Sequence, residues 1–541
     1  MIDAILQNLN TVGKHSQQRP ILAAIDIGTN SLHMVVVEIK PELPAFSVIA
    51  REKDTVRLGD RDPNTGNLNA AIMEKAIAAL GRYQTIALSL GAQEVIAVAT
   101  SATREAPNGR EFIDMIDRAL GLKVDLISGV EEARRIYLGV LSGLEFDNIP
   151  RISIDIGGGS TEIILGDSEE PRTLSSTKIG AVRLSSELVT TDPISDQEFN
   201  YLQAYICGQL ERSIEEIKAN LKPGELPQMV GTSGTIETAC MIIGREKTGV
   251  LPSRLHGFQL QRKDVEQLVQ KMRRLNVTER SQIPGLSERR AEIILPGLLV
   301  LLHAMTALKM ESLLLCERSL REGVIVDWML AHGLVEDRLR YQSSIKERST
   351  LKIADKYGVD IRHGQKVAEL AVEIFNYMLV EKLHSHLPDA RRYLWSAAIL
   401  HNSGHFVSHS AHHKHSYYLI RYGELLGYNE LEIEIIANLA RYHRKTMPKK
   451  KHEGYQTLSR ENKLLVSQLG AILRVAIALD RRTIGAVKEI ECDFQPATRT
   501  LNLQLTPTTA GDDCQLELWS LDFKKSWFEQ EFDVQLMAQI K

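Results

Sequence analysis

The chain has 541 residues, and 65 Lys or Arg against 69 Asp or Glu give it a formal net charge of −4. A hydrophobic content of 43% with 25% charged residues is typical of globular protein and excludes a wholly disordered or fibrous chain. The near balance of charge argues against a general nucleic-acid binder, and the length favours about three or four domains.

The five cysteines are scattered without a CxxC pair, which argues against a disulfide framework or a zinc site and suits a reducing cytosol. The first residues lack the basic and then apolar layout of a secretory signal. The longest apolar run, from Ile293 to Leu308, contains Pro296 and is too short to span a bilayer, so it predicts a buried helix. We therefore expect a soluble cytoplasmic protein with no membrane partner and no specific nucleic-acid partner.

Strand-like and helical patterns alternate from Ile21 to Glu322, which is typical of an α/β fold. Short runs rich in β-branched residues predict strands at 21–28, 31–39, 46–52, 94–100 and 151–157. Apolar residues at helical spacing predict helices at 71–90 and 111–120. From Asp337 to about Ile484 helical patterns dominate. The tail alternates at 489–494, 498–505 and 514–523, which predicts three strands of a small sheet.

One strand-and-turn motif occurs twice. The segment DIGTNS (Asp26–Ser31) follows an apolar strand, and DIGGGS (Asp155–Ser160) follows another. Two copies imply two related lobes. The sequence contains neither a Walker GxxxxGK[ST] pattern nor a GxGxxG pattern, which disfavours the P-loop and dinucleotide-binding folds.

The repeated turns have the composition of phosphate loops. Glycine lets the backbone approach a ligand closely, and successive N–H groups form an anion-binding concavity. The first copy adds side-chain donors at 29–31, and the second continues into Ser160 and Thr161. The aspartate at each strand end can bind a divalent cation. The alternative is a tight hairpin with an Asx turn, which is less attractive for a matched pair than for a single copy.

Three further segments suggest chemistry. GTSGT (Gly231–Thr235) lies between an apolar pair and a helical run, so it predicts a strand, a loop and a helix N-terminus that can hold an anion. Arg104 follows a strand and a small-residue turn, and arginine there can hold a phosphoryl group through two hydrogen bonds. Glu162 follows the second loop and can join Asp155 at a metal. The alternatives are an ordinary strand-to-helix turn, a surface ion pair and a solvated strand residue.

Glu132 lies in the segment ISGVEEARRIYLGV. Ser128 and Glu131 have the spacing of a capping box at a helix start, which gives Glu131 a structural task and leaves Glu132 without one. A carboxylate beside a phosphate site can orient and deprotonate a water molecule. The alternative is that both glutamates only interact with the dipole of the helix in its first turn.

Together these segments resemble the exopolyphosphatase / guanosine pentaphosphate phosphatase family. The two DIG loops, TSATREA, SGVEEARRIYLGV, GTSGT, PGLSERRAEIILPG and LREGV occur in the family's order over Ile21–Val324, and the helical half resembles the C-terminal region of long exopolyphosphatases. The resemblance implies an α/β fold of two actin-like, sugar-kinase-like (RNase H-like) lobes with the active site between them, then an all-α HD-like domain and a small α+β domain. We place these parts at 1–136, 137–333, 334–487 and 488–541.

The resemblance also assigns roles to individual residues. Glu132 matches the catalytic base, Arg104 matches a catalytic phosphate-contacting residue, and Asp155 and Glu162 match metal-associated acids. The other phosphate-binding positions are Asp26, Gly28, Thr29, Asn30, Ser31, Gly157, Gly158, Gly159, Ser160, Thr161, Gly234, Thr235 and Arg290.

The implied function is an exopolyphosphatase, in which Glu132 deprotonates a water that attacks the terminal phosphorus of inorganic polyphosphate and releases orthophosphate. The implied cofactors are Mg²⁺ or Mn²⁺ and a monovalent cation such as K⁺, and the implied assembly is a homodimer. The nearest alternative is a guanosine pentaphosphate (pppGpp) 5′-phosphatase. A phosphotransferase of the same fold and a polyphosphate-binding sensor without activity are weaker alternatives.

Histidines concentrate in the helical half, where six lie between His401 and His415. Those at 401, 405, 409 and 413 repeat every fourth residue, which is metal-like on a helix, although Gly404 and nearby serines weaken a continuous helix. The resemblance implies an HD-like fold with His363, His401 and Asp480 in the expected places. Asn402 stands where an HD metal site needs aspartate, and a neutral amide is a poor replacement, so we predict a catalytically inactive module.

Basic residues between Arg441 and His452 have no acidic neighbours. They predict a groove that follows a long polyphosphate chain, with binding that weakens as salt increases. The alternative, strongest for the lysines at 449–451, is a solvated loop. The residues predicted to form the groove are Lys414, Arg441, His443 and Arg444.

Overall fold

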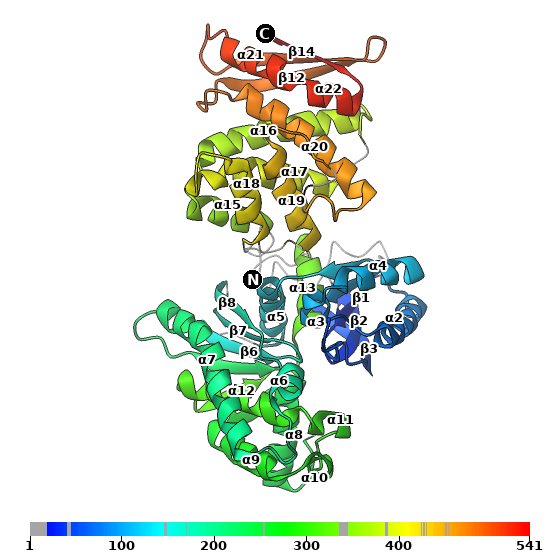
Figure 1. Ribbon diagram of the computed structural model, residues 1–541, viewed down its shortest axis with the longest axis vertical. Coiled ribbons are helices and arrows are strands. Elements are labelled where there is room, and N and C mark those ends of the chain that lie inside the picture. Colours follow the sequence, from blue (N-terminus) through cyan, green and yellow to red (C-terminus); the bar gives the residue numbers. More distant parts are fainter. Residues whose placement is uncertain are drawn as a thin grey trace, which may run out of the picture. The chain divides into compact units, whose positions relative to one another are not determined.

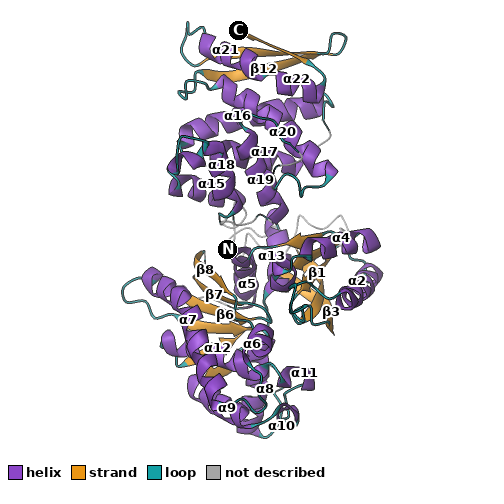
Figure 2. Cartoon of the chain, viewed as in Figure 1, coloured by secondary structure: helices purple, strands orange, loops and turns teal. Residues whose placement is uncertain are grey.

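The computed structural model describes residues 19–40, 45–144, 149–168, 170–252, 255–334, 345–384, 388–423, 425, 428, 430–449, 452 and 454–541. The chain divides into two compact units, Met1–Ser343 and Ser344–Lys541. Strands and helices alternate in the first unit, whereas the second is mainly helical with a terminal sheet (Figures 1 and 2). The units are described separately below.

The first lobe of unit one is a mixed sheet with helices. Its strand order is β3-β2-β1-β4-β5, in which β1, β2 and β3 are antiparallel and β1, β4 and β5 are parallel. The strands are β1 (Ile21–Ile27), β2 (Ser31–Lys40), β3 (Ala45–Thr55), β4 (Glu94–Ala99) and β5 (Val124–Leu126). The helices are α2 (Ala70–Ser89), α3 (Ser101–Glu105), α4 (Gly109–Leu120) and α5 (Gly129–Gly143).

The second lobe repeats this topology. Its order is β10-β11-β9-β6-β7-β8, so that β8-β7-β6-β9-β11 corresponds to β3-β2-β1-β4-β5 with one added strand. The strands are β6 (Arg151–Ile156), β7 (Thr161–Gly166), β8 (Pro171–Thr177), β9 (Gln228–Thr232), β10 (Gln259–Gln261) and β11 (Ser312–Leu315). The helices are α6 (Ala181–Leu188), α7 (Asp196–Asn220), α8 (Gly234–Thr248), α9 (Arg262–Arg274), α10 (Val277–Ser281), α11 (Glu288–Ala291), α12 (Ile294–Ala307) and α13 (Leu320–Ala331). Two such lobes are the actin-like, RNase H-like architecture that we predicted.

The repeated motif has the same register in both lobes. Asp26 lies opposite His33 in the β1–β2 hairpin, and Asp155 lies opposite Glu162 in the β6–β7 hairpin. Directly opposed residues of an antiparallel pair share one face of the sheet. The two hairpins therefore present equivalent pairs of side chains, which confirms the internal repeat.

Two glycines allow α5 and α13 to pack closely across the lobes. A Cβ at Gly323 of α13 would lie 1.7 Å from the carbonyl oxygen of Arg135 on α5, and one at Gly139 would lie 2.0 Å from that of Ser319. Only glycine allows this close approach. The predicted boundary after residue 136 falls within α5, whose apolar side chains pack in one core with residues of both lobes.

The second unit begins with a helical bundle. It contains α15 (Ile345–Lys356), α16 (Ile361–Val380), α17 (Pro388–Leu400), a 3₁₀ turn (Ser403–Phe406), α18 (His412–Arg421), α19 (Glu430–Tyr442) and α20 (Arg460–Leu479). By length and composition α20 is the one helix among the described residues that could cross a membrane, but 61% of its apolar window is buried inside the protein, as in a core helix. The predicted buried helix at 293–308 is confirmed as α12.

The C-terminal sheet corrects one prediction. It contains β12 (Val487–Gln495), β13 (Thr500–Pro507) and β14 (Gln535–Ile540), whereas residues predicted as a strand at 514–523 form α21 (Gln515–Lys524), which α22 (Ser526–Phe532) follows. The apolar alternation of this segment resembles a strand, but its buried residues, Glu517, Ser520 and Leu521, have helical spacing. One core joins this sheet to the helices.

Candidate active site

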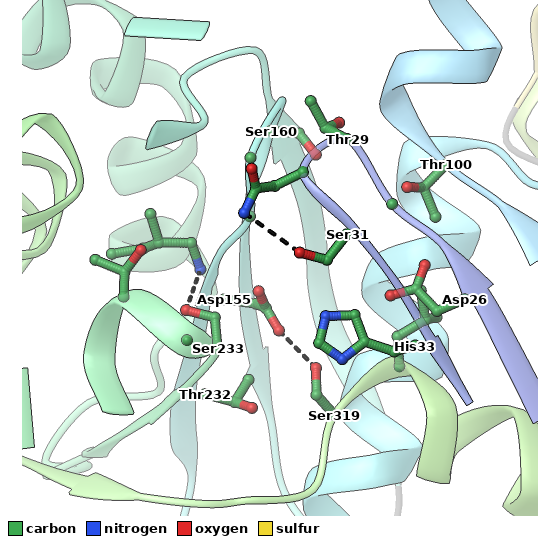
Figure 3. A pocket seen from close by; sticks show the side chains of 18 of the residues that line it. Asp26, Thr29, Ser31, His33, Thr100, Asp155, Ser160, Thr232, Ser233 and Ser319 are labelled. Carbon is green, nitrogen blue, oxygen red and sulfur yellow. Dashed lines mark hydrogen bonds between the residues drawn. The ribbon is translucent and has the colours of Figure 1, made fainter. Parts of the chain in front are cut away.

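A pocket of about 190 Å³ lies between the two lobes of unit one. Its walls come from the tips of both hairpins, the GTSGT loop and the start of α13 (Figure 3). The first turn of α5 and α11 complete them. The predicted site residues that line it are Asp26, Gly28, Thr29, Asn30, Ser31, Glu132, Asp155, Gly157, Gly158, Gly159, Ser160, Glu162, Gly234, Thr235 and Arg290.

Amides of the same lobe bond the carbonyl groups at the tip of the first hairpin. The Gly28 amide donates to the Ser31 carbonyl at 3.2 Å. The Thr29 carbonyl accepts from the Gly59 amide at 2.8 Å, and the Asn30 carbonyl accepts from the Arg57 amide at 2.9 Å. This bonding fixes the peptide planes of the tip.

The second hairpin uses the same device with a different partner. The Gly157 amide donates to the Ser160 carbonyl at 2.9 Å, and the Gly157 and Gly158 carbonyls accept from the first amides of α6, at Ala181 and Val182, at 2.9 Å. In the described part of the chain, neither hairpin's tip amides (Thr29 and Asn30, Gly158 and Gly159) donate a hydrogen bond. Both hairpins can therefore donate to an anion.

The two tips touch each other. A Cβ at Gly158 would lie 3.0 Å from the Cβ of Thr29, and one at Gly159 would lie 2.5 Å from the Ser101 hydroxyl. These contacts explain why the second loop is glycine, because any side chain would push the lobes apart. Thr161 corrects a prediction: its side chain is fully buried, donates to the Ile179 carbonyl at 2.9 Å and does not line the pocket.

Six acids line this pocket, and four of them, Asp26, Glu132, Asp155 and Glu162, are predicted site residues. Burial raises the pKa of Asp26 to about 7 and that of Asp155 to about 6. Burial, with the charges of Glu132 and Asp155, raises the pKa of Glu162 well above its usual range. One oxygen of Asp26 is buried without a hydrogen-bond partner in the described structure, whereas the Ser319 hydroxyl donates to Asp155 at 2.5 Å (Figure 3). Such crowded acids favour protonation or a bound cation.

Glu132 forms a hydrogen-bonded ion pair with Arg104. It lies in the first turn of α5 with 7% of its surface exposed, and Arg104 donates to its Oε2 at 3.1 Å and to the Ile127 carbonyl at 2.8 Å. Burial raises the pKa of Glu132 and Arg104 opposes the rise. Arg104 does not line the pocket. The structure therefore makes Arg104 the partner of Glu132, and its contact with phosphate stays a prediction.

Glu131 has a structural task, but not the predicted one. Its amide donates to the Ser128 hydroxyl at 3.2 Å, which caps α5, while its carboxylate binds Arg134 and Arg135 instead of returning to the cap. Arg134 also donates to Asp327 of α13 at 2.7 Å. This buried network anchors α5 and leaves Glu132 as the acid of this turn that faces the pocket.

One wall of the pocket is cationic, and the sequence predicted Arg290 of this wall but not Lys53 or Arg321. It contains Lys53, Arg290 and Arg321, and none of their charged groups makes a hydrogen bond or ion pair in the described structure, although Arg290 packs on the backbone of Gly234. Burial lowers the pKa of both Lys53 and Arg290. Beside them, burial lowers the pKa of His33 well below its usual range, so its ring is neutral.

Two signals in the sequence pointed to missed residues. His33 occupies in the first repeat the position that Glu162 occupies in the second, so the repeat itself identifies it. Ser319 and Arg321 lie in or beside the LREGV segment, at the start of α13. Lys53 lies on β3 without a local motif, and we find no signal for it.

The GTSGT segment forms the predicted strand, loop and helix N-terminus, as β9 and α8. Ser233 has a φ of 92°, which non-glycine residues rarely adopt and which tight functional loops hold. Its hydroxyl accepts from the Ile156 amide at 3.3 Å, which ties this loop to the end of β6.

The acids of the pocket can take part in binding a divalent cation. Among the described residues, no three His, Cys, Asp or Glu side chains converge closely enough to hold a metal by themselves. Mg²⁺ usually takes one or two carboxylates, and the phosphates of a substrate complete its shell. The crowded acids and the unpartnered oxygen of Asp26 fit that mode of binding.

The histidines of unit two do not form the helical array that their spacing suggests. His401 follows α17, His405 lies in the 3₁₀ turn and His413 lies in α18, so they share no helix face. The predicted trio is brought together: His363 bonds Asp480 at 2.7 Å and its ring lies 5.4 Å from that of His401. Burial lowers the pKa of His401 to about 3, so that ring is neutral.

The predicted polyphosphate groove is only partly at the surface. His443 is 4% exposed and its ring bonds His412 and the Ala440 carbonyl, which contradicts its assignment to a surface groove. Arg444 donates to His412 at 3.1 Å, and Arg441 lies over the ring of Tyr417. Lys414 is exposed. The residues at 450 and 451 lie outside the described residues.

Comparisons with known proteins agree over both units. The model of the Ppx/GppA phosphatase family matches residues 35–332, and that of Ppx/GppA phosphatase domain III matches residues 345–525. A guanosine-5′-triphosphate,3′-diphosphate pyrophosphatase of Aeromonas hydrophila is 27% identical over 89% of this chain and 92% of its own length. Its namesake from Pseudoalteromonas translucida is 27% identical over 87% of this chain and 89% of its own.

Two solved structures resemble more than half of the chain. A Ppx/GppA family member of Aquifex aeolicus is 28% identical, with a TM-score of 0.50, over 58% of this chain and 98% of its own. An exopolyphosphatase of Cytophaga hutchinsonii is 26% identical, with a TM-score of 0.53, over the same shares of each chain.

Proposed function

Because the chain belongs to the Ppx/GppA phosphatase family, which makes it a phosphoric-anhydride hydrolase, we propose that it is an exopolyphosphatase. It would remove the terminal phosphate of inorganic polyphosphate and release orthophosphate. The observation that carries this proposal is the pair of touching hairpins, whose free amides lie in one pocket with the buried carboxylate of Glu132.

The terminal phosphoryl group would bind the amides of both hairpin tips. These donors are fixed in advance, because each tip's carbonyls are bonded from behind, so they stabilise charge on the transferring oxygens without reorganisation. The neighbouring hydroxyls of Thr29, Ser31 and Ser160 add donors. Mg²⁺ or Mn²⁺ held by Asp155 and Glu162 would supply further positive charge at these oxygens.

Glu132 would orient a water molecule and take its proton. The water oxygen forms a bond to the terminal phosphorus as the bond to the bridging oxygen breaks, and the shortened chain departs. Burial raises the pKa of Glu132, which makes it a stronger base than an exposed carboxylate. Arg104 would hold the carboxylate in place through its hydrogen bond.

The cationic wall would bind the remaining phosphates. Lys53, Arg290 and Arg321 carry charges that no acidic side chain pairs at hydrogen-bond distance in the described structure, and all three line the pocket. This wall supports a substrate with several consecutive phosphates.

The second candidate is pppGpp, with the same chemistry and a nucleotide as leaving group. The names of the two curated relatives favour it. A phosphotransferase predicts phosphate on an acceptor molecule, and a binding sensor predicts no release.

The test is a comparison of kcat/KM for long polyphosphate and for pppGpp, with released orthophosphate as the readout and Glu132→Gln as the control. We expect hydrolysis of both, with polyphosphate favoured. A higher kcat/KM for pppGpp than for polyphosphate would make the pppGpp phosphatase the favoured function. If neither substrate yields orthophosphate, the proposal is rejected.

The same proposal places the enzyme in the cytoplasm, in keeping with five free cysteines among the described residues. The homodimer and the K⁺ requirement stay predictions, which the mass of the particle in solution and the salt dependence of turnover test.

A further inference from the structure

Arg183, on α6 of the second lobe, bonds to both lobes at once. Its Nε donates to the Gly159 carbonyl at 3.0 Å, and its Nη2 donates to Glu105 of the first lobe at 2.6 Å. The side chains of Arg183 and Glu105 are 18% and 13% exposed, so this ion pair is largely shielded from water. Arg183 therefore bonds the second hairpin and the first lobe with one guanidinium group.

Glu105 continues this connection to the catalytic residues. It is the last residue of α3, a helix of five residues. Ser101 of the same helix donates to Glu105 at 2.9 Å and lines the pocket, and Arg104 donates to Glu132. A chain of hydrogen bonds thus runs from the second hairpin through Arg183 and Glu105 to α3, the helix whose Arg104 bonds the Glu132 carboxylate.

The position of this bridge matters because the hairpins are in contact. A Cβ at Gly159 would lie 2.5 Å from the Ser101 hydroxyl, on the same helix as Glu105. A shift of one lobe by about 1 Å would separate the amide donors from the base, and misplacement on that scale costs up to about 10²-fold in rate.

We propose that Arg183 is a positioning residue for phosphate hydrolysis, which keeps the two hairpins in register across the boundary between the lobes through its bonds to Glu105 and Gly159. Its effect on activity rests on the proposed function. Its effect on the two lobes does not.

The chain offers a matched control. Arg57 and Glu292 also form an ion pair between the lobes, at 2.8 Å, but both side chains are 46% exposed and neither bonds a hairpin with its side chain. Glu292→Gln is therefore the same substitution as Glu105→Gln in an interlobe pair whose side chains do not touch the site. Exposed pairs of this kind contribute little to stability.

The experiment is a double-mutant cycle of Arg183→Ala and Glu105→Gln, with kcat and KM measured for tripolyphosphate. We expect Arg183→Ala to lower kcat by about 10²-fold and to change KM by less than about threefold. The double variant is expected to be about as slow as Arg183→Ala, because both changes break the Arg183–Glu105 bond, and the further pair of Glu105 with Lys178, at 3.6 Å and with Lys178 69% exposed, contributes little. Arg183→Lys should recover part of kcat, and Glu292→Gln should match the wild type.

A second readout is hydrogen–deuterium exchange without substrate. In Arg183→Ala, loss of the bridge should increase exchange both at 157–160 and at 101–105 of the other lobe. Arg183→Lys keeps the charge and should show a weaker increase, so it serves as the test variant if Arg183→Ala does not fold. Unchanged kcat, a loss confined to KM, an equal loss in Glu292→Gln or unchanged exchange at 101–105 would overturn the inference. If wild-type protein hydrolyses neither polyphosphate nor pppGpp, the proposed function is rejected. The exchange data would still show whether Arg183 keeps the two lobes in register.

Discussion

The two phosphate hairpins share one backbone design and differ in their side chains. In each, the glycine after the strand donates to a serine carbonyl, and neighbouring amides bind the carbonyls of the tip. However, Asp26 is paired across its hairpin with neutral His33, whereas Asp155 is paired with Glu162. Arg321 lies near both Asp26 and His33, and Lys53 lies opposite His33 on β3. The repeat thus supplies two hairpin tips whose amides can bind an anion, and under the proposed function the paired side chains would specialise one hairpin for a cation and the other for the anionic chain.

The largest effect should come from substitution of Glu162, and the matched substitution of His33 should have a smaller one. Glu162→Gln removes a charge proposed to hold the divalent cation, so kcat/KM should fall at least about 10²-fold and the half-saturating Mg²⁺ concentration should rise. His33→Gln, the matched change in the other hairpin, removes a neutral ring and should cost about 10-fold or less. Steady-state kinetics over a Mg²⁺ titration measures both. Equal losses in the two variants would contradict the division of roles.

The cationic wall predicts an effect on binding. Lys53→Met keeps the length of the side chain and removes its charge, so KM for long polyphosphate should rise about 10-fold while kcat changes little. The difference from wild type should shrink as salt is added, because screening weakens the same attraction. A fall in kcat at unchanged KM would place Lys53 with the reacting group instead.

The acids predict an unusual dependence of stability on pH in metal-free protein. The pKa values of Asp26 and Asp155 are raised from 3.8 to about 7 and about 6, so the folded state holds protons that the unfolded state has released. The free energy of unfolding should therefore decrease as pH rises from about 4 to about 7. Asp26→Asn should flatten this slope up to about pH 7, and Asp155→Asn only up to about pH 6. Thermal unfolding measures it, and stability that rises over this window in both variants and in wild type would contradict the account.

The smallest effect should come from unit two. Charge reversal at Arg441 and Arg444 should raise KM for long chains by about threefold and leave KM for tripolyphosphate unchanged. A matched control is reversal at Arg460, a basic residue at the start of α20 outside the predicted groove. The same change in KM for both chain lengths would reject the groove.

The sequence predicted the parts of the site that depend on local backbone. The DIG turns, the strand before each of them and the isolation of Glu132 from the cap all follow from short-range patterns, and the structure places them in one pocket. The sequence did not predict roles for Lys53 and Arg183, because these roles depend on contacts with residues far away in the sequence. Nothing in the spacing around Arg183 indicates Glu105.

The errors have related causes. The segment 514–523 alternates like a strand, but packing on α20 selects a helix with Glu517 and Leu521 buried. The four-residue spacing of histidines from His401 onward fits one helix, but the chain breaks it at a 3₁₀ turn, where Gly404 and the nearby serines already weakened that interpretation. His443 was grouped with the basic residues of the groove, but its ring is neutral, because burial and His401 lower its pKa well below the usual range. Tertiary burial overrode the local pattern in each case.

The central claim is that Glu132 activates water at a phosphate clamped between two hairpins. The most direct test is single-turnover hydrolysis of tripolyphosphate in ¹⁸O-labelled water by wild type and Glu132→Gln, with tripolyphosphate binding measured in parallel. We predict one labelled oxygen in the orthophosphate released by wild type, a rate at least about 10²-fold lower in the variant, and binding within about threefold of wild type. Near-wild-type turnover in Glu132→Gln, or unlabelled orthophosphate from wild type, would contradict the account.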